Sequence, residues 1–145
     1  MIGKILNELD IIEENIGISK DFNNFELQKA IGHLDHKKAY QIVNYFAQNS
    51  KQHPFVMTIS ILYLYFKKVM TLHTVRDRNP RTVAKALGIN PYFVNEYMAV
   101  SKNYSMKRIS GVLETLRKYD AKSKGVGANL SPRDLYNELI YNILK

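Results

Sequence analysis

The sequence predicts an all-α domain, a compact array of about six or seven helices. Two observations carry this prediction: apolar residues recur with helical spacing along most of the chain, and no segment shows the alternation of a strand. Only 7 Gly and 4 Pro occur in 145 residues, which disfavours a turn-rich all-β protein. Since 46% of the residues are apolar, a chain of this length can bury one core.

Capping residues mark the starts of the first helices. A short acidic helix is expected to end near Gly17, and the next helix to begin at Asn23-Asn24. Asp35 is placed to cap a third helix, because its carboxylate can accept the free amides of the first turn. The apolar residues of this third helix share one face: Ala39, Ile42, Val43, Phe46 and Ala47.

The most apolar helix is expected over residues 54–73. Two apolar stripes run along it. The first consists of Phe55, Ile59, Leu62, Phe66 and Val69, and the second of Met57, Ile61, Leu64 and Tyr65. A helix that is apolar on most sides must be surrounded, so we expect it at the centre of the domain. Its most apolar stretch, residues 54–66, is shorter than the roughly 20 residues that span a bilayer, and no membrane partner is expected.

The later helices begin with a cap residue, in three cases followed by proline. Proline suits the first helical position, where a backbone N–H would be unpaired anyway. The three pairs are Asn79-Pro80, Asn90-Pro91 and Ser131-Pro132. Another helix is expected from Ser105, with a buried face of Met106, Ile109, Val112, Leu113 and Leu116. The last helix is expected to bury Leu135, Leu139, Ile140, Ile143 and Leu144, after a glycine-containing loop over residues 122–129.

The charge is positive and unevenly distributed. There are 21 Lys and Arg against 13 Asp and Glu, a net charge of +8. Residues 1–50 hold 5 basic and 7 acidic side chains, residues 51–100 hold 7 and 2, and residues 101–145 hold 9 and 4. Such asymmetry is compatible with a nucleic acid or an acidic protein partner, although a solvated basic surface is the commoner outcome.

No segment carries the residues of a catalytic or cofactor site. The chain has no Cys, which excludes thiolate zinc sites and cysteine nucleophiles. His33 and His36 flank Asp35, but a helix start at Asp35 breaks the face that a metal would need. The Lys-Gly-Val-Gly run at residues 124–127 lacks the spacing of a phosphate-binding loop. We therefore expect no enzyme activity, no metal and no cofactor.

One segment, residues 82–97, has the pattern of a DNA-binding helix-turn-helix. A small residue, a turn glycine and a buried aliphatic fall in the expected order at Ala84, Gly88 and Val94. The would-be recognition helix, however, has no Lys or Arg before Lys102, so few groups could read guanine edges or neutralise phosphates. Duplex recognition stays open as the alternative function.

Four separated elements resemble one protein family. They are IGISKDFNNFELQKAI at residues 16–31, NYFAQNSKQHPFVMTISILYLYF at 44–66, LGINPYFVNEY at 87–97, and LRKYDAKSKGVG at 116–127. Together they resemble the C-terminal domain of the delta subunit of the bacterial DNA polymerase III clamp loader. The resemblance includes a helix ending in Leu-Gly, a following Asn-Pro-Tyr-Phe-Val start, and Asp120, Lys122, Lys124 and Gly125 at the last element.

The resemblance implies a role in assembly. Delta subunits belong to a pentameric machine of AAA+ modules, whose C-terminal helical domains join into a collar. It implies residues 1–20 as a remnant of the lid domain and residues 21–145 as the collar domain of a non-catalytic, cytoplasmic bacterial replication subunit. The implied partners are the gamma/tau and delta-prime subunits, the sliding clamp through an N-terminal domain not included in this sequence, and DNA as part of the complex.

Six residues are candidates for the subunit interface. Tyrosine suits interfaces because its ring can be buried while its hydroxyl stays hydrogen-bonded, and the chain has 10 Tyr and no Trp. The aromatic candidates are Tyr92, Phe93, Tyr97 and Tyr104. Core packing is the alternative, with most weight for Phe93 and Tyr97. Lys122 and Lys124 could face an acidic partner, with a solvated loop as the preferred alternative.

Overall fold

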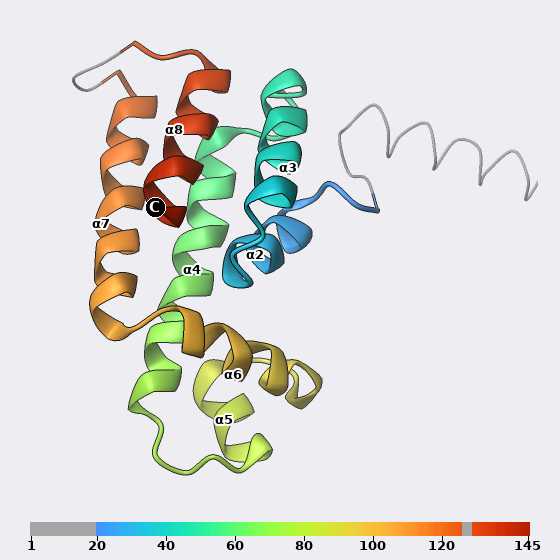
Figure 1. The fold of residues 1–145 in the computed structure, drawn as a ribbon, viewed down its shortest axis with the longest axis vertical. Coiled ribbons are helices and arrows are strands. Elements are labelled where there is room, and N and C mark those ends of the chain that lie inside the picture. The colour runs from blue at the N-terminus through green and yellow to red at the C-terminus, as the bar shows by residue number, and fades with distance from the viewer. Residues whose placement is uncertain (1–19, 126–128) are drawn as a thin grey trace, which may run out of the picture.

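The computed structural model describes residues 20–125 and 129–145 and confirms the all-α prediction (Figure 1). These residues form seven α-helices and one 3-10 turn, and they contain no strand. The elements are α2 (Asn24–Gly32), α3 (His36–Gln48), α4 (Phe55–Thr74), α5 (Pro80–Leu87), η1 (Pro91–Phe93), α6 (Val94–Asn103), α7 (Met106–Ser123) and α8 (Pro132–Leu144). The helix predicted before Gly17, and the lid remnant except for Lys20, lie outside the described residues.

Side-chain caps begin the helices where the sequence predicted them. Asn23 Oδ1 accepts the Glu26 amide at 2.8 Å, and Asp35 Oδ1 accepts the Lys38 amide at 3.1 Å. Four further predicted caps are formed at Asn79, Asn90, Ser105 and Ser131. One helix start differs from the prediction: the Asn-Pro pair at residues 90–91 begins the 3-10 turn η1, and α6 follows it from Val94.

Helix α4 is the central element, as predicted. It packs against α7, α6, α5, α2 and α8, and in Figure 1 it joins the two ends of the molecule. Its first predicted stripe is buried throughout. The prediction that the second stripe is buried is wrong in part. Tyr65 is buried, but Met57 is exposed and Leu64 is 62% exposed. The neighbouring helices cover only part of the circumference of α4, so an apolar strip remains on the surface.

The bounds of α4 agree, to within one residue at each end, with the helix expected over residues 54–73. The helix has 20 residues, and an 18-residue window within it has a mean hydropathy of 1.4, values that a membrane-spanning helix would also show. Eight of its residues are buried against other helices of the domain. Core helices of globular domains share this length and composition, and the contacts of α4 identify it as one of them.

Nearly all the residues that were predicted to be buried on α7 and α8 are buried in the structure. Only Met106, in the first turn of α7, is exposed among the five residues expected to be buried there. On α8 all five are buried, together with Tyr136, which was not predicted. Tyr136 Oη donates a hydrogen bond to the carbonyl of His53 (2.9 Å) and lies 3.0 Å from Thr58 Oγ1. Burial, opposed by the hydrogen bond to Thr58, raises the pKa of Tyr136 to about 12, so this hydroxyl is a donor at neutral pH.

The C-terminal end of α2 approaches α4 and α6 closely. Tyr104 Oη donates to the Ile31 carbonyl at 2.7 Å, and Asn103 Nδ2 donates to the Gly32 carbonyl at 3.0 Å. Gly32 is buried there, and a Cβ at this position would meet Tyr65 Oη and would lie 2.8 Å from Val100 Cγ2. Only glycine therefore allows α2 to approach α4 and α6 so closely.

Gly32→Ala is expected to lower the free energy of unfolding by about 1–3 kcal/mol, because the added methyl overpacks a rigid site. The matched control is Gly111→Ala on α7, where a Cβ would meet no atom within 4 Å. That change should stabilise the helix by about 0.5–1 kcal/mol. Urea denaturation followed by circular dichroism measures both. An unchanged midpoint for Gly32→Ala would refute the close approach.

Candidate functional site

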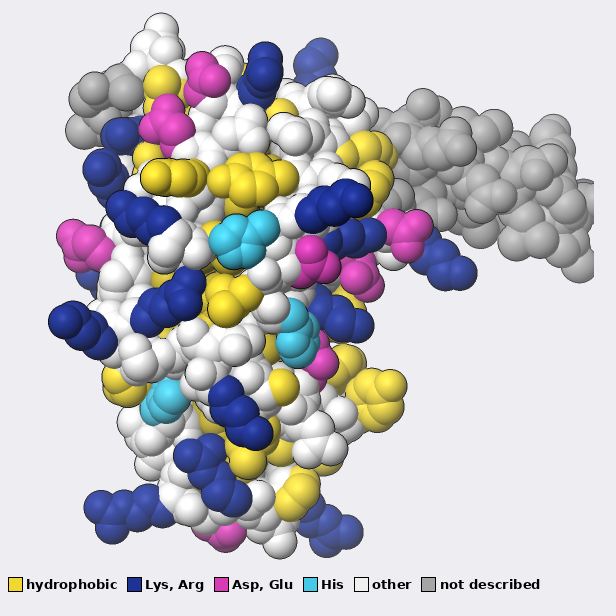
Figure 2. Space-filling model, viewed as in Figure 1, with side chains coloured by type: hydrophobic (Ala, Val, Ile, Leu, Met, Phe, Trp, Pro, Cys, Tyr) yellow, Lys and Arg dark blue, Asp and Glu magenta, His cyan; other side chains and the backbone are white. Residues whose placement is uncertain are grey.

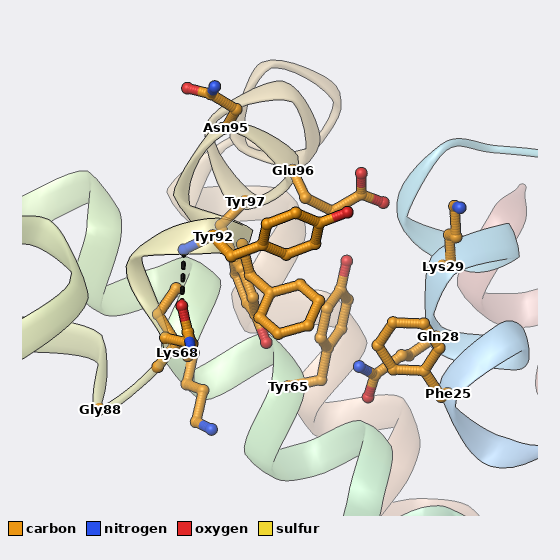
Figure 3. A pocket seen from close by; sticks show the side chains of 13 residues that line it. Phe25, Gln28, Lys29, Tyr65, Lys68, Gly88, Tyr92, Asn95, Glu96 and Tyr97 are labelled. Atoms are coloured by element: carbon orange, nitrogen blue, oxygen red, sulfur yellow. Dashed lines mark hydrogen bonds between the residues drawn. The ribbon is translucent and has the colours of Figure 1, made fainter. Parts of the chain in front are cut away.

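A groove of about 800 Å³ lies between α2, α4 and the connection from α5 to α6 (Figure 3). We call it the aromatic groove. Helix α2 contributes Phe25, Gln28 and Lys29, and α4 contributes Tyr65 and Lys68. The connection contributes Gly88, Ile89, Asn90, Tyr92 and Phe93, and the first turn of α6 contributes Asn95, Glu96 and Tyr97. Segments more than 60 residues apart in the chain therefore build one surface feature.

Local sequence signals shape the wall formed by residues 88–93. Helix α5 ends at Gly88, whose φ of +68° is in the left-handed region that glycine adopts without a Cβ penalty. Asn90 Oδ1 then accepts the amide of Tyr92 at 2.8 Å, and Pro91 starts the 3-10 turn. This turn directs the Tyr92 ring into solvent, where it is 83% exposed.

The aromatic rings of the groove form two contact groups. Phe93 lies 6.0 Å from Phe25 and 5.1 Å from Tyr92 between ring centroids, both edge to face. Tyr65 and Tyr97 pack at 5.3 Å and form the floor. Phe25 is 50% exposed. Exposed aromatic surface of this kind is typical of interaction sites, because rigid rings lose little entropy when a partner covers them.

The charges around the groove are mostly positive. Lys29 and Lys68 lie on opposite sides of the rings (Figure 3), and neither forms an ion pair with another described residue. The one lining carboxylate, Glu96, contacts His33 Nε2 at 2.6 Å. His33 is thus directed toward α6, and the described residues contain no group of three or more His, Cys, Asp or Glu that could hold a metal ion.

Tyr65, on the floor, has an unusual hydroxyl. The side chain is only 4% exposed, and its Oη is the one buried side-chain polar atom without a partner among the described residues. Burial, and then the neighbouring Tyr97 and Glu96, raise the pKa of Tyr65 far above its usual value. Burial and Glu96 raise the pKa of Tyr97 as well. Both floor hydroxyls are therefore neutral under physiological conditions.

The structure separates the six predicted interface residues. Tyr92 and Phe93 line the groove near its exposed edge, and Tyr97 is buried in the floor. The prediction that Tyr104 lies at a subunit interface is wrong. The residue is fully buried and its hydroxyl donates to the Ile31 carbonyl, so it belongs to the core and offers no surface to a partner.

The two predicted lysines lie far from the groove, at the C-terminal end of α7 (Figure 1). Lys124 Nζ contacts Asp120 Oδ2 at 3.1 Å. Lys122 Nζ lies 4.8 Å from the centroid of the Tyr119 ring and 4.0 Å from Glu138 Oε1. Both therefore already have acidic neighbours within the chain. The structure does not join them with the aromatic candidates into one site.

Only Tyr92, Phe93 and Tyr97 of the groove were among the predicted interface residues, and Phe25, Lys29 and Lys68 are among those that the sequence reasoning missed. The position of Phe25 in the sequence could have identified it as a surface aromatic residue. It lies outside the stripe that α2 buries, which contains Leu27, Ala30 and Ile31, so it is an aromatic residue on the polar face of a short helix. Nothing in the sequence indicates that Lys29 and Lys68 lie near the aromatic rings, because their distance from the rings depends on how α2 packs against α4.

The comparison with protein families matches residues 21–131 to the DNA polymerase III delta subunit, C-terminal domain. The chain belongs to this family. The match confirms the resemblance seen in the sequence and contains every helix from α2 to α7, hence the whole aromatic groove of this delta C-terminal domain. No curated protein and no solved structure matches the chain.

Tyr65→Phe is expected to raise the free energy of unfolding of this delta C-terminal domain by about 1 kcal/mol, because it removes a buried hydroxyl that has no partner among the described residues. Tyr104→Phe is the control, since it removes the same atom where that atom donates a hydrogen bond. It should lower stability by about 1 kcal/mol. Thermal unfolding distinguishes them. An equal loss in both variants would mean that the Tyr65 hydroxyl is paired.

Proposed function

We propose that this chain is the collar domain through which a delta subunit joins its neighbours in the clamp loader, and that the aromatic groove is part of the joining surface. The observation that carries the proposal is the family match over residues 21–131, which includes an exposed aromatic groove. The proposed role is structural and non-catalytic: the domain orders subunits that hydrolyse ATP and load the sliding clamp on primed DNA.

The composition of the groove supports a protein partner. Protein interfaces are enriched in aromatic side chains at the centre and are rimmed by polar groups. The groove has this arrangement, with Phe25, Tyr92 and Phe93 as apolar contacts and with Gln28 and Asn95 beside them. Tyr92 is the best anchor, since it is the most exposed of the large apolar residues described.

The expected partners are the gamma/tau and delta-prime subunits, in the bacterial cytoplasm where the polymerase works. We further propose that residues 1–20 are the end of a lid domain and that the collar begins at residue 21. The start of the family match at residue 21 supports this boundary. We propose that contact with the sliding clamp is made by another domain of the delta subunit and not by this one.

Tyr92→Ala is expected to weaken binding of the chain to a mixture of gamma/tau and delta-prime subunits by about 30-fold, because truncating a central aromatic anchor costs roughly 2 kcal/mol. Tyr141→Ala is the matched control, since Tyr141 is 61% exposed on α8, outside the groove. Analytical ultracentrifugation measures both. If the unaltered chain forms no complex while a full-length delta subunit does in parallel, the proposal is wrong.

A second candidate function, duplex DNA binding, is favoured by one specific observation. Residues 67–108 contain nine Lys and Arg but only two Asp and Glu, so they hold +7 of the net charge of +8. They form the end of the molecule with α5 and α6, where Figure 2 shows many basic side chains. Within the described ranges, none of the ion pairs involves one of these nine cations.

If this basic end binds duplex DNA, the affinity should fall steeply with salt. Arg81→Gln with Lys85→Gln, both exposed on α5, should then reduce the slope of log affinity against log salt by about 2, since each phosphate contact contributes about 0.9. Lys37→Gln with Lys51→Gln is the control outside this region. Fluorescence anisotropy with a labelled duplex measures the slope. An identical slope in all three proteins would exclude the second candidate.

A further inference from the structure

The aromatic groove combines two kinds of recognition in one place. Its rings offer an apolar contact, with Phe25 and Tyr92 exposed on either side of Phe93. Its two lysines offer charge: Lys29 comes from α2 and Lys68 from α4, on opposite sides of the rings (Figure 3). A partner that satisfies both must carry an apolar side chain with negative charge near it.

Among the described residues, Lys29 and Lys68 have no competing acidic partner. The described residues place no carboxylate in an ion pair with either of them. Glu96, the acidic residue that lines the groove, is held 2.6 Å from His33 Nε2. Binding of an acidic partner therefore need not break an existing ion pair of Lys29 or Lys68, which favours net attraction over exchange.

A peptide segment fits these features better than a nucleic acid. A nucleic acid carries a phosphate at every residue, so some of its charge would face the carboxylate of Glu96, whereas a peptide can place its carboxylates beside Lys29 and Lys68 only. The cations outside the groove that would suit a phosphate backbone include Arg81 and Lys85 on α5, which do not line it. Gln28 reaches from α2 toward Tyr65 (Figure 3), where its amide can both donate to and accept from a peptide backbone.

We propose that the aromatic groove binds an acidic segment of a neighbouring protein, which inserts one large apolar side chain between Phe25 and Tyr92 and places carboxylates beside Lys29 and Lys68. The volume of about 800 Å³ is in the range of sites that enclose a compact ligand group. The inference rests on the proposed function only for the identity of the neighbour, because the chemistry of the groove is that of this chain.

The test uses the whole 145-residue chain and a labelled probe peptide. The probe is a short Gly/Ser peptide with one central Phe flanked by Asp residues. Two comparison peptides replace Phe by Ser, or every Asp by Lys. Fluorescence anisotropy should detect binding of the probe, weakened about tenfold or more by either replacement and by added salt, which screens the lysines.

Variants of the chain locate the binding. Lys29→Glu with Lys68→Glu should weaken the probe about tenfold or more, and Phe25→Ala should weaken it as well. Lys37→Glu with Lys51→Glu makes the same change of charge outside the groove and should leave the affinity nearly unchanged. The uncharged pair Lys29→Gln with Lys68→Gln repeats the test if the first double variant unfolds.

Two results with the probe peptides would overturn the inference. One is equal binding of the probe and the Lys-containing peptide. The other is displacement of the probe by single-stranded DNA that itself loses affinity in the Lys29/Lys68 variants, which would assign the groove to nucleic acid. Assembly with gamma/tau and delta-prime is measured separately. A complex that forms normally with the Lys29/Lys68 variants would overturn the inference alone, whereas no complex with the unaltered chain would overturn the proposed function.

Discussion

The close approach of the end of α2 to α4 and α6 is the contact on which the rest of the domain depends. The last carbonyls of a helix have no partner within it, and here Tyr104 and Asn103 donate to those of Ile31 and Gly32. The absent side chain of Gly32 lets Tyr65 and Val100 lie against the backbone. Two hydrogen bonds and one missing methyl thus fix the position of α6 relative to α2, and with it the α5–α6 end of the molecule.

The aromatic groove is a direct consequence of this junction. Phe25 and Lys29 lie within two turns of Gly32 on the same helix. The position of α2 against α4 and α6 therefore determines how far these two side chains lie from Phe93 and Lys68. The junction also leaves the Tyr65 hydroxyl buried without a partner among the described residues, which is destabilising by about 1 kcal/mol. The domain therefore accepts an unfavourable polar group at the floor of its most exposed aromatic surface, a combination common where a surface serves binding rather than stability.

Local signals made most of the fold predictable from the sequence, whereas the site needed the structure. Caps such as Asp35 and Ser131 depend on neighbours within one turn, so sequence reasoning found them. Tyr92 and Tyr104 show the limit. Each lies outside the α-helices, where helical periodicity defines no inner face. Tyr104 is buried because its hydroxyl meets Ile31, 73 residues earlier in the chain, and Tyr92 is exposed because a 3-10 turn directs it outward.

The region matched by the family contains the aromatic groove, whereas helix α8, which lies outside the match, contributes to the core and not to the groove. The match ends at residue 131, yet α8, from Pro132, packs against α3, α7 and α4, and Tyr136 bonds to the His53 carbonyl. Helix α8 is thus needed for the core but contributes nothing to the aromatic groove. Many apolar sequences can fill a core position at similar volume, whereas a groove requires particular side chains. The matched region therefore contains the surface that we assign to assembly, and the unmatched helix supplies the packing that holds α3, α4 and α7 together.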